Sequence, residues 1–153
     1  MKSERIARAD TASLWAGVLL GIGVAGTLDG VVLHEFLQWH NFYVHTTRFW
    51  RIFIDGAFHL FSGAMLLLGA LRLWALRGPL GQACGRALAA GIFLGAGGFN
   101  LYDGTIQHKV LRLHPVREGV PNELPYDLAF NAVALLLLVV GWLLWRGRAR
   151  RTE

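Results

Sequence analysis

Four long apolar runs dominate the sequence and limit what the chain can fold into. They lie near residues 13–36, 50–74, 87–108 and 126–145, and each approaches the roughly 20 residues that a helix needs to cross a bilayer. A water-soluble four-helix bundle would keep a polar stripe along each helix, and residues 135–145 contain none. The chain is 54% hydrophobic. The sequence therefore predicts an all-α membrane protein, in which residues 1–153 form one domain with four transmembrane helices.

The basic residues are distributed unequally between the two ends of these expected spans. The chain carries 15 Lys and Arg against 10 Asp and Glu. Because cytoplasmic loops are enriched in Lys and Arg, we expect both termini and the 75–86 loop to lie in the cytoplasm. The Arg-rich C-terminus is typical of an anchor on anionic lipid, so we expect the bilayer, and not nucleic acid, as partner. Ten of the 15 basic residues lie on this side: Lys2, Arg5, Arg8, Arg72, Arg77, Arg86, Arg146, Arg148, Arg150 and Arg151.

One polar motif occurs twice, each time at the end of an apolar run. Residues 29–40 and 103–114 both read Asp-Gly-x3-His-x2-Leu-x2-His, with an offset of 74 positions. An aspartate near the bilayer centre costs about 2.5–3.5 kcal/mol on insertion scales. A costly cluster that recurs at one depth indicates a binding site, and histidine with aspartate indicates a metal site.

The repetition extends to the neighbouring spans. Residues 55–59 (Asp-Gly-Ala-Phe-His) align with residues 127–131 (Asp-Leu-Ala-Phe-Asn) at an offset of 72. The chain is therefore predicted to consist of two parallel helical-hairpin repeats, about 13–74 and about 87–146. Such repeats are related by a pseudo-two-fold axis along the membrane normal, and sites tend to form where they meet. Asn131 stands where His59 would be, which favours one asymmetric site over two identical ones.

The candidate metal ligands are histidines and aspartates near the outer ends of the spans. On a continuous α-helix, Asp29, His34 and His40 cannot reach a single ion, so we expect several helices to contribute. The expected core is three imidazoles, His34, His59 and His108. A carboxylate of Asp29, Asp55 or Asp103 would be a fourth ligand or would orient a ligating histidine from behind. His40 and His114, nearer the interface, are further candidates.

Imidazole binds copper, zinc, iron and nickel. We expect copper first, with zinc or iron as alternatives, in metal handling or redox chemistry on the outer side. Three other interpretations stay open. His34 and His108 could ligate a b-type haem, the Asp and His residues could form a proton or ion pathway, or the chain could be a ligand-free scaffold whose polar groups satisfy one another. No catalytic residue can be assigned, and no nucleotide-cofactor motif is present in the sequence.

Three segments carry a resemblance to a known family: residues 28–40, 54–59 and 99–108. They resemble the bacterial predicted-membrane-protein family known only as domain of unknown function 2243, over nearly the whole chain. The resemblance implies a small multi-span protein of the bacterial cytoplasmic (inner) membrane. It also suggests respiratory-chain or metal-handling proteins as partners, including respiratory oxidase assembly, and it is compatible with an oligomer. It brings no established activity.

Overall fold

The chain folds into helices alone in the part that the computed structural model describes, residues 2–77 and 85–147. Most of the expected 75–86 loop and the arginines 148, 150 and 151 lie outside the described residues. Two short π-helices extend the first and third α-helices. In chain order the elements are α1 (Lys2–Leu28), η1 (Asp29–Phe36), α2 (Arg48–Ala75), α3 (Gly85–Tyr102), η2 (Asp103–Val110) and α4 (Leu124–Gly147).

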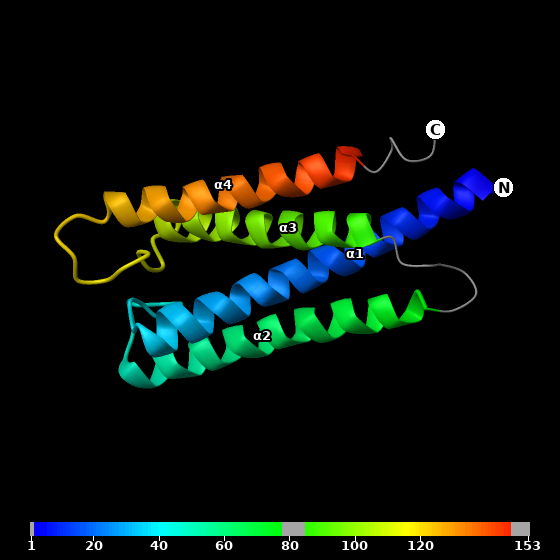
Figure 1. Ribbon diagram of the computed structural model, residues 1–153. Helices are drawn as coiled ribbons and strands as arrows, with labels where there is room; N and C mark the ends of the chain where they lie inside the picture. Colours follow the sequence, from blue (N-terminus) through cyan, green and yellow to red (C-terminus); the bar gives the residue numbers. More distant parts are fainter. Residues whose placement is uncertain (1, 78–84, 148–153) are drawn as a thin grey trace.

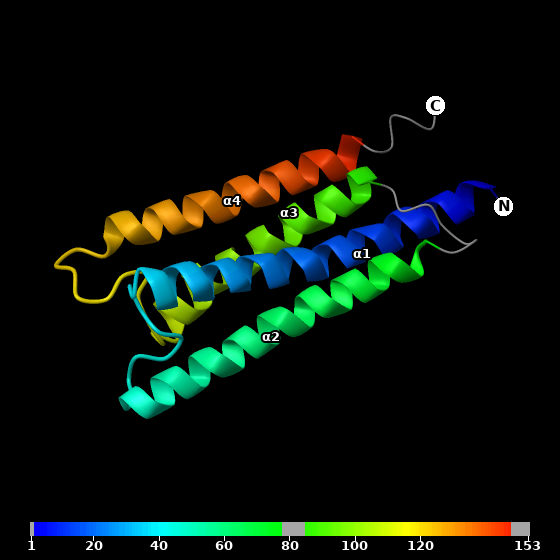
Figure 2. The same cartoon turned by 60° about the horizontal axis from the view of Figure 1, so that its bottom comes forward.

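The four α-helices lie side by side in the order α2, α1, α3, α4 (Figures 1 and 2). α1 packs against α2 and α3, and α3 packs against α4. α1 and α3 form the centre of this row and run in the same direction, while α2 and α4 return along its two outer sides. The start of α1 and the end of α4 lie at one end of the molecule. η1, η2 and the loops that follow them lie at the other.

Small residues let the two central helices approach closely. A Cβ atom added at Gly17 of α1 would lie 2.9 Å from the Cα of Gly91 in α3, and one added at Gly91 would lie 2.9 Å from the Cα of Gly17. Ala16, Ala87 and Ala90 are completely buried around this crossing. Membrane helices commonly associate through such small residues, because backbone contact replaces the hydrophobic effect as the driving force.

The outer helices direct much of their apolar surface away from the protein. Leu60 of α2 is 78% exposed and Leu136 of α4 is 62% exposed. Contiguous apolar surface of this extent is not expected on a soluble monomer. Within residues 2–77 and 85–147, three helical segments are long and apolar enough to cross a membrane: Glu4–Phe36, Arg48–Ala75 and Leu124–Gly147. The third of the four expected spans, near residues 87–108, does not meet this criterion of length and hydropathy. Its α-helical part has 18 residues, and the following π-helix brings polar side chains.

Two loops, residues 37–47 and 111–123, pack together over the end of the row that carries the π-helices. The Val44 N–H donates to the Leu113 carbonyl over 3.1 Å, and the Glu118 N–H donates to the Trp39 carbonyl over 2.7 Å. The guanidinium of Arg117 lies 5.2 Å from the centre of the Trp39 ring. These contacts fix the loops against each other, so residues on both loops can share one site.

Candidate metal centre

The π-helices bring together residues that an α-helix would separate. η1 begins at Asp29 and η2 begins at Asp103, the first residue of each motif copy. In a π-helix the backbone hydrogen bonds join residues five apart, and such turns are frequent at functional sites. The His34 Nε2 consequently lies 3.3 Å from Asp29 Oδ2, and the His108 Nε2 lies 3.0 Å from Asp103 Oδ2.

A left-handed residue then turns each chain segment back toward the centre. Gln38 has φ 50° and Arg112 has φ 51°, and these are the non-glycine residues with positive φ in the described part of the chain. The Trp39 N–H donates to the Leu33 carbonyl over 2.8 Å, and the Leu113 N–H donates to the Gln107 carbonyl over 2.9 Å. This reversal carries His40 and His114, which follow two positions later, back over the π-helix.

The expectation that Asp29, His34 and His40 cannot meet was therefore wrong. Atoms of these three side chains that could ligate a metal all lie within 4.8 Å of one another. The expectation assumed a continuous α-helix, whereas the segment is a π-helix closed by a left-handed residue. Neither departure from α-helical geometry is evident in the spacing of the motif.

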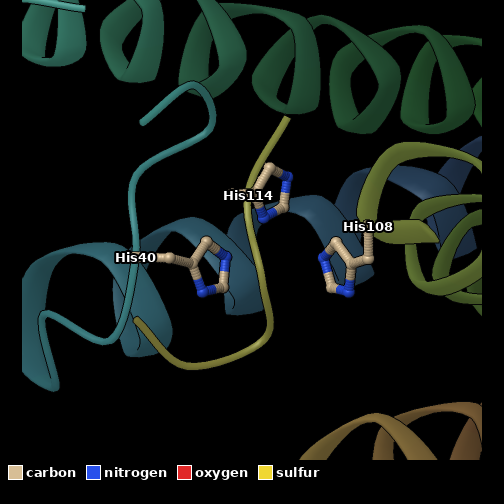
Figure 3. Close-up of side chains that lie close together, drawn as sticks. All are labelled: His40, His108 and His114. Atoms are coloured by element: carbon tan, nitrogen blue, oxygen red, sulfur yellow. The ribbon is translucent and has the colours of Figure 1, made fainter. Parts of the chain in front are cut away.

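Four imidazoles gather at this point, two from each motif copy. His34 lies 4.6 Å from His40, and His108 lies 4.4 Å from His114, between ring centroids. His40 and His114 stack with centroids 4.5 Å apart. Figure 3 shows the rings of His40, His108 and His114 facing a common space from two loops and a helix. Ligand atoms of these three also lie within 4.8 Å of one another, so His40 belongs to both groups.

These imidazoles are buried, and most of their nitrogens have no hydrogen-bond partner. The four histidines are 2–4% exposed. Within the described residues, both ring nitrogens of His34, His108 and His114 lack a hydrogen-bond partner, as does the Nε2 of His40. The histidine nitrogens therefore lie close to aspartate oxygens without the alignment of a hydrogen bond. Buried polar atoms rarely remain unpaired without a reason, and unpaired nitrogens that converge with carboxylates fit a set of metal ligands.

Two outer contacts set the orientation of individual rings. The Nδ1 of His40 lies 2.8 Å from the Val116 carbonyl. A carbonyl only accepts, so this nitrogen carries the proton and Nε2 presents a lone pair to the centre. The His34 Nδ1 lies 3.2 Å from Asp55 Oδ1. That carboxylate is itself fixed, because it accepts from the Phe42 N–H over 2.7 Å and from the Asn41 amide over 2.6 Å. Carboxylates behind ligating histidines play this part in metal sites.

His59 does not join the other imidazoles. Its Nδ1 donates to the Asp55 carbonyl one turn earlier over 2.6 Å, and its ring lies against Gly30, where an added Cβ would come within 2.8 Å of Nε2. Asn131 repeats this arrangement, since its amide donates to the Asp127 carbonyl over 2.9 Å and its side chain lies against Gly104. These residues pack the outer helices onto the π-helices. The expected core of His34, His59 and His108 is replaced in the structure by His34, His40, His108 and His114.

Burial keeps the two loop histidines neutral. It lowers the pKa of His40 to about 4, against a partly opposing effect of Asp29. Burial, with the neighbouring imidazoles of His40 and His108, lowers the pKa of His114 to about 2. A neutral imidazole is the form that ligates a metal. Both rings are therefore available as ligands at neutral pH without losing a proton.

Two cavities lie beside the imidazoles, and a third, of about 480 Å³, reaches Asp29 between apolar side chains. A polar one of about 450 Å³ reaches His108 and His114 from the loop side, between Lys109, Arg112 and Glu123. An apolar one of about 760 Å³ lies between α1, α2 and α3, with Phe42 and Phe58 in its wall. Phe58 stacks on the His34 ring at 5.6 Å, so apolar side chains separate this second cavity from the imidazoles. The centre thus has a polar side and an apolar side.

Sequence reasoning missed one ion pair beside the site. Lys109 pairs with Asp127, the residue that corresponds to Asp55 in the second half of the chain. From its place at the outer end of an apolar run, Lys109 alone would be predicted to be an interfacial charge. The sequence signal for this ion pair is that Lys109 directly follows His108 and that Asp127 lies at the start of the next apolar run.

A helical fold with three apolar spans and a buried histidine cluster at one end defines the class as an integral membrane protein. The chain belongs to the family described as "Predicted membrane protein (DUF2243)", whose family model matches residues 16–148. This confirms the expected resemblance. No curated protein and no solved structure matches the chain.

Proposed function

We propose that this protein holds a transition metal, copper first, at the outer face of the bacterial cytoplasmic membrane, and serves in metal handling or redox chemistry there. One observation carries the proposal. Two copies of one motif bring buried aspartates and imidazoles together, and within the described residues seven of the eight ring nitrogens have no hydrogen-bond partner. A set of imidazole and carboxylate donors without a thiolate suits first-row metals, and Cu²⁺ binds most tightly among these.

We place the centre on the outer side because most basic residues lie at the opposite end of the helices. Arg5 and Arg8 lie near the start of α1 and Arg146 near the end of α4. The positive-inside rule directs that end to the cytoplasm. The third span would then comprise α3 with η2, so that the polar π-helices lie at equal depths in the outer half.

The proposal includes two parallel hairpin repeats, α1 with α2 and α3 with α4. The reciprocal contact of Gly17 and Gly91, which are 74 positions apart, supports a pseudo-two-fold axis between α1 and α3. Gln38 and Arg112, again 74 apart, share the same rare backbone conformation. An ion at the end of α1 and α3 would lie on or near this axis, where parallel repeats tend to place their sites.

Elemental analysis tests the proposal. Protein purified in detergent, loaded with Cu²⁺ and passed through a desalting column should retain copper. His40→Ala combined with His114→Ala should reduce the retained copper to background. His45→Ala is the matched control, because this histidine is exposed and its Nε2 donates to the Arg112 carbonyl over 2.8 Å. Background copper in the wild type, and equally background zinc and iron, would refute the metal proposal.

An optical spectrum separates the haem alternative in the same sample. Bis-histidine ligation would require His34 and His108 to face a porphyrin, but the rings of His40 and His114 lie against both of them. The contacts therefore favour a compact ion over a macrocycle. A Soret band would reverse this preference. A metal-free and haem-free protein that conducts protons in liposomes, with the flux lost on Asp55→Asn, would support the ion-pathway alternative.

A further inference from the structure

The six inner donors divide into two triads, one from each motif copy. The first triad is Asp29, His34 and His40, and the second triad is Asp103, His108 and His114. In the second triad, Asp103 contacts both histidines, with Oδ2 3.0 Å from His108 Nε2 and Oδ1 3.6 Å from His114 Nε2. In the first triad, ligand atoms of all three residues lie within 4.8 Å of one another, whereas in the second triad the carboxylate of Asp103 lies beside each of the two imidazoles.

One ion does not account for all six donors. Tetrahedral and square-planar metals take four ligands, so two of the buried donors would remain unpaired at a cost in free energy. His40 could approach either triad, but its Nδ1 donates to Val116 and leaves a single lone pair on Nε2. One lone pair ligates one ion. Assigning His40 to the first triad leaves Asp103 to complete the second, and every donor then has a metal partner.

The surroundings of the two triads differ at one matched pair of residues. Behind the first triad, Asp55 lies 3.2 Å from the His34 Nδ1 and is held by two donated hydrogen bonds from residues 41 and 42. The corresponding Asp127 is instead paired with the Lys109 ammonium. Neither the His34 Nδ1 nor the His108 Nδ1 makes an aligned hydrogen bond within the described part of the chain, so the difference between the two triads is the Asp55 carboxylate beside His34. Loss of an outer partner typically weakens a metal site about 10- to 100-fold.

Access differs in the same direction. The polar cavity of about 450 Å³ is lined by His108 and His114 of the second triad and by no member of the first. The charges around it are mixed, because Lys109 lies 3.9 Å from Glu123 in addition to its pair with Asp127. In the first triad, His40 stacks on His114 and His34 stacks on Phe58, and the cavity of about 480 Å³ that reaches Asp29 is otherwise lined by apolar residues and Asn100. The polar route to the centre therefore leads to the second triad, and we expect the ion at that triad to exchange with the outside.

We propose that the centre binds two ions of unequal affinity: a retained ion at Asp29, His34 and His40, and an exchangeable ion at Asp103, His108 and His114. The inference rests on the proposed metal function and adds to it. A centre of this kind can accept and deliver one ion through the polar cavity while the other stabilises the fold. The geometry thus favours metal handling, with the second triad as the transfer site.

The test is a chelator titration of the copper-loaded protein in nanodiscs, with copper and protein measured together. The wild type should bind two Cu²⁺ per chain, and a chelator of intermediate strength should remove one of them first. Asp55→Asn preserves the shape of the side chain and removes its charge, and it should weaken the retained ion about 10- to 100-fold. Asp127→Asn is the matched control at the corresponding position, and it should leave the retained ion unchanged.

The outcomes separate the two proposals. Absence of bound copper, zinc and iron refutes the proposed function and the inference together. One ion per chain, lost in both His34→Gln and His108→Gln, leaves the proposed function standing and overturns the two-ion assignment. Two ions of equal affinity, or equal effects of Asp55→Asn and Asp127→Asn, overturn the assigned inequality. Gel filtration shows whether a variant elutes like the wild type. For a variant that elutes differently, the electron paramagnetic resonance spectrum of its remaining copper is recorded. The two-ion assignment requires this spectrum to contain the signal of the triad that was not mutated.

Discussion

His40 and His114 stack with 4.5 Å between ring centroids and 13° between ring planes. Each ring follows, two positions later, a residue in the left-handed conformation. The stack is therefore made by two loops that are 74 residues apart in sequence and fold back in the same way. It joins the two triads, and removal of either ring should affect both halves of the chain.

Copper should stabilise the wild-type protein more than it stabilises His114→Ala. A ligand at about 100 times its Kd contributes about 2.7 kcal/mol to stability. For a chain of 153 residues, this corresponds to a rise in Tm of roughly 5–10 °C. His114→Ala should lose part of the rise, because the second triad loses one of its three donors while the first triad keeps all of its own. The measurement is thermal unfolding in nanodiscs with and without Cu²⁺, and His45→Ala should behave as wild type. A full rise in His114→Ala would contradict the assignment of this ring as a ligand.

The left-handed turn at Gln38 should be sensitive to β-branched residues. Gln38 has φ 50°, a conformation that costs a non-glycine residue about 1–2 kcal/mol. Gln38→Gly removes this cost and should leave stability equal or slightly higher. Gln38→Val should destabilise the protein by about 1–2 kcal/mol and displace His40, so copper retention should fall. Leu37→Val is the control, because Leu37 directly precedes Gln38 and has φ −85°. Equal copper retention in both valine variants would show that the turn does not position His40.

The helical class and the site were predictable to different degrees from the sequence. The apolar runs indicated the helices, since length and hydropathy alone determine whether a segment can cross a bilayer. The structure describes four helices, with three that meet this criterion. The repeat at offset 74 selected Asp29, His34, Asp103 and His108, which the structure brings together at one end of the helices, and it included His40 and His114 as outer candidates.

The composition of the site's core was not predictable, because it depends on backbone geometry that the motif does not encode. Whether Asp29 and His34 meet is decided by a change from α- to π-helix between Leu28 and Asp29. Whether His40 enters the centre is decided by a left-handed glutamine, a residue type without a strong preference for that conformation. His59 appeared equivalent to these residues in sequence, yet its hydrogen bond to the Asp55 carbonyl directs it to the packing between η1 and α2.

Acid should destabilise the metal-free protein through its loop histidines. Burial lowers the pKa of His40 to about 4 and that of His114 to about 2, whereas an unfolded histidine titrates near 6.5. Below about pH 6.5 the unfolded state binds more protons than the folded state, so the free energy of unfolding falls as pH falls. The loss contributed by His40 continues to about pH 4.

The measurement is Tm in nanodiscs with a chelator, from pH 7.5 to pH 4.5. His34, His108, Asp29 and Asp103 face the same rings, so the informative quantity is a difference between variants. His114→Phe should show a shallower fall in Tm than the wild type, whereas His45→Phe should show the same fall. Identical pH profiles for the wild type and His114→Phe would contradict neutral burial of His114.

The crossing of α1 and α3 should not tolerate even one methyl group. In Gly17→Ala the added Cβ would lie 2.9 Å from both the Gly91 Cα and the Ile92 backbone nitrogen, which are atoms that cannot rotate away. The helices must separate, and overpacking of this kind costs about 1–3 kcal/mol.

Gly63→Ala in α2 is the matched control, because an added Cβ there meets nothing within 4 Å. It should be neutral, or stabilising by up to about 1 kcal/mol through helix propensity. Reversible unfolding in mixed SDS and detergent micelles measures the stability of both variants. Equal stabilities would show that the glycine contact between α1 and α3 does not hold the row of helices together. Since both π-helices project from these two α-helices, Gly17→Ala should also lower copper retention, whereas Gly63→Ala should leave it unchanged.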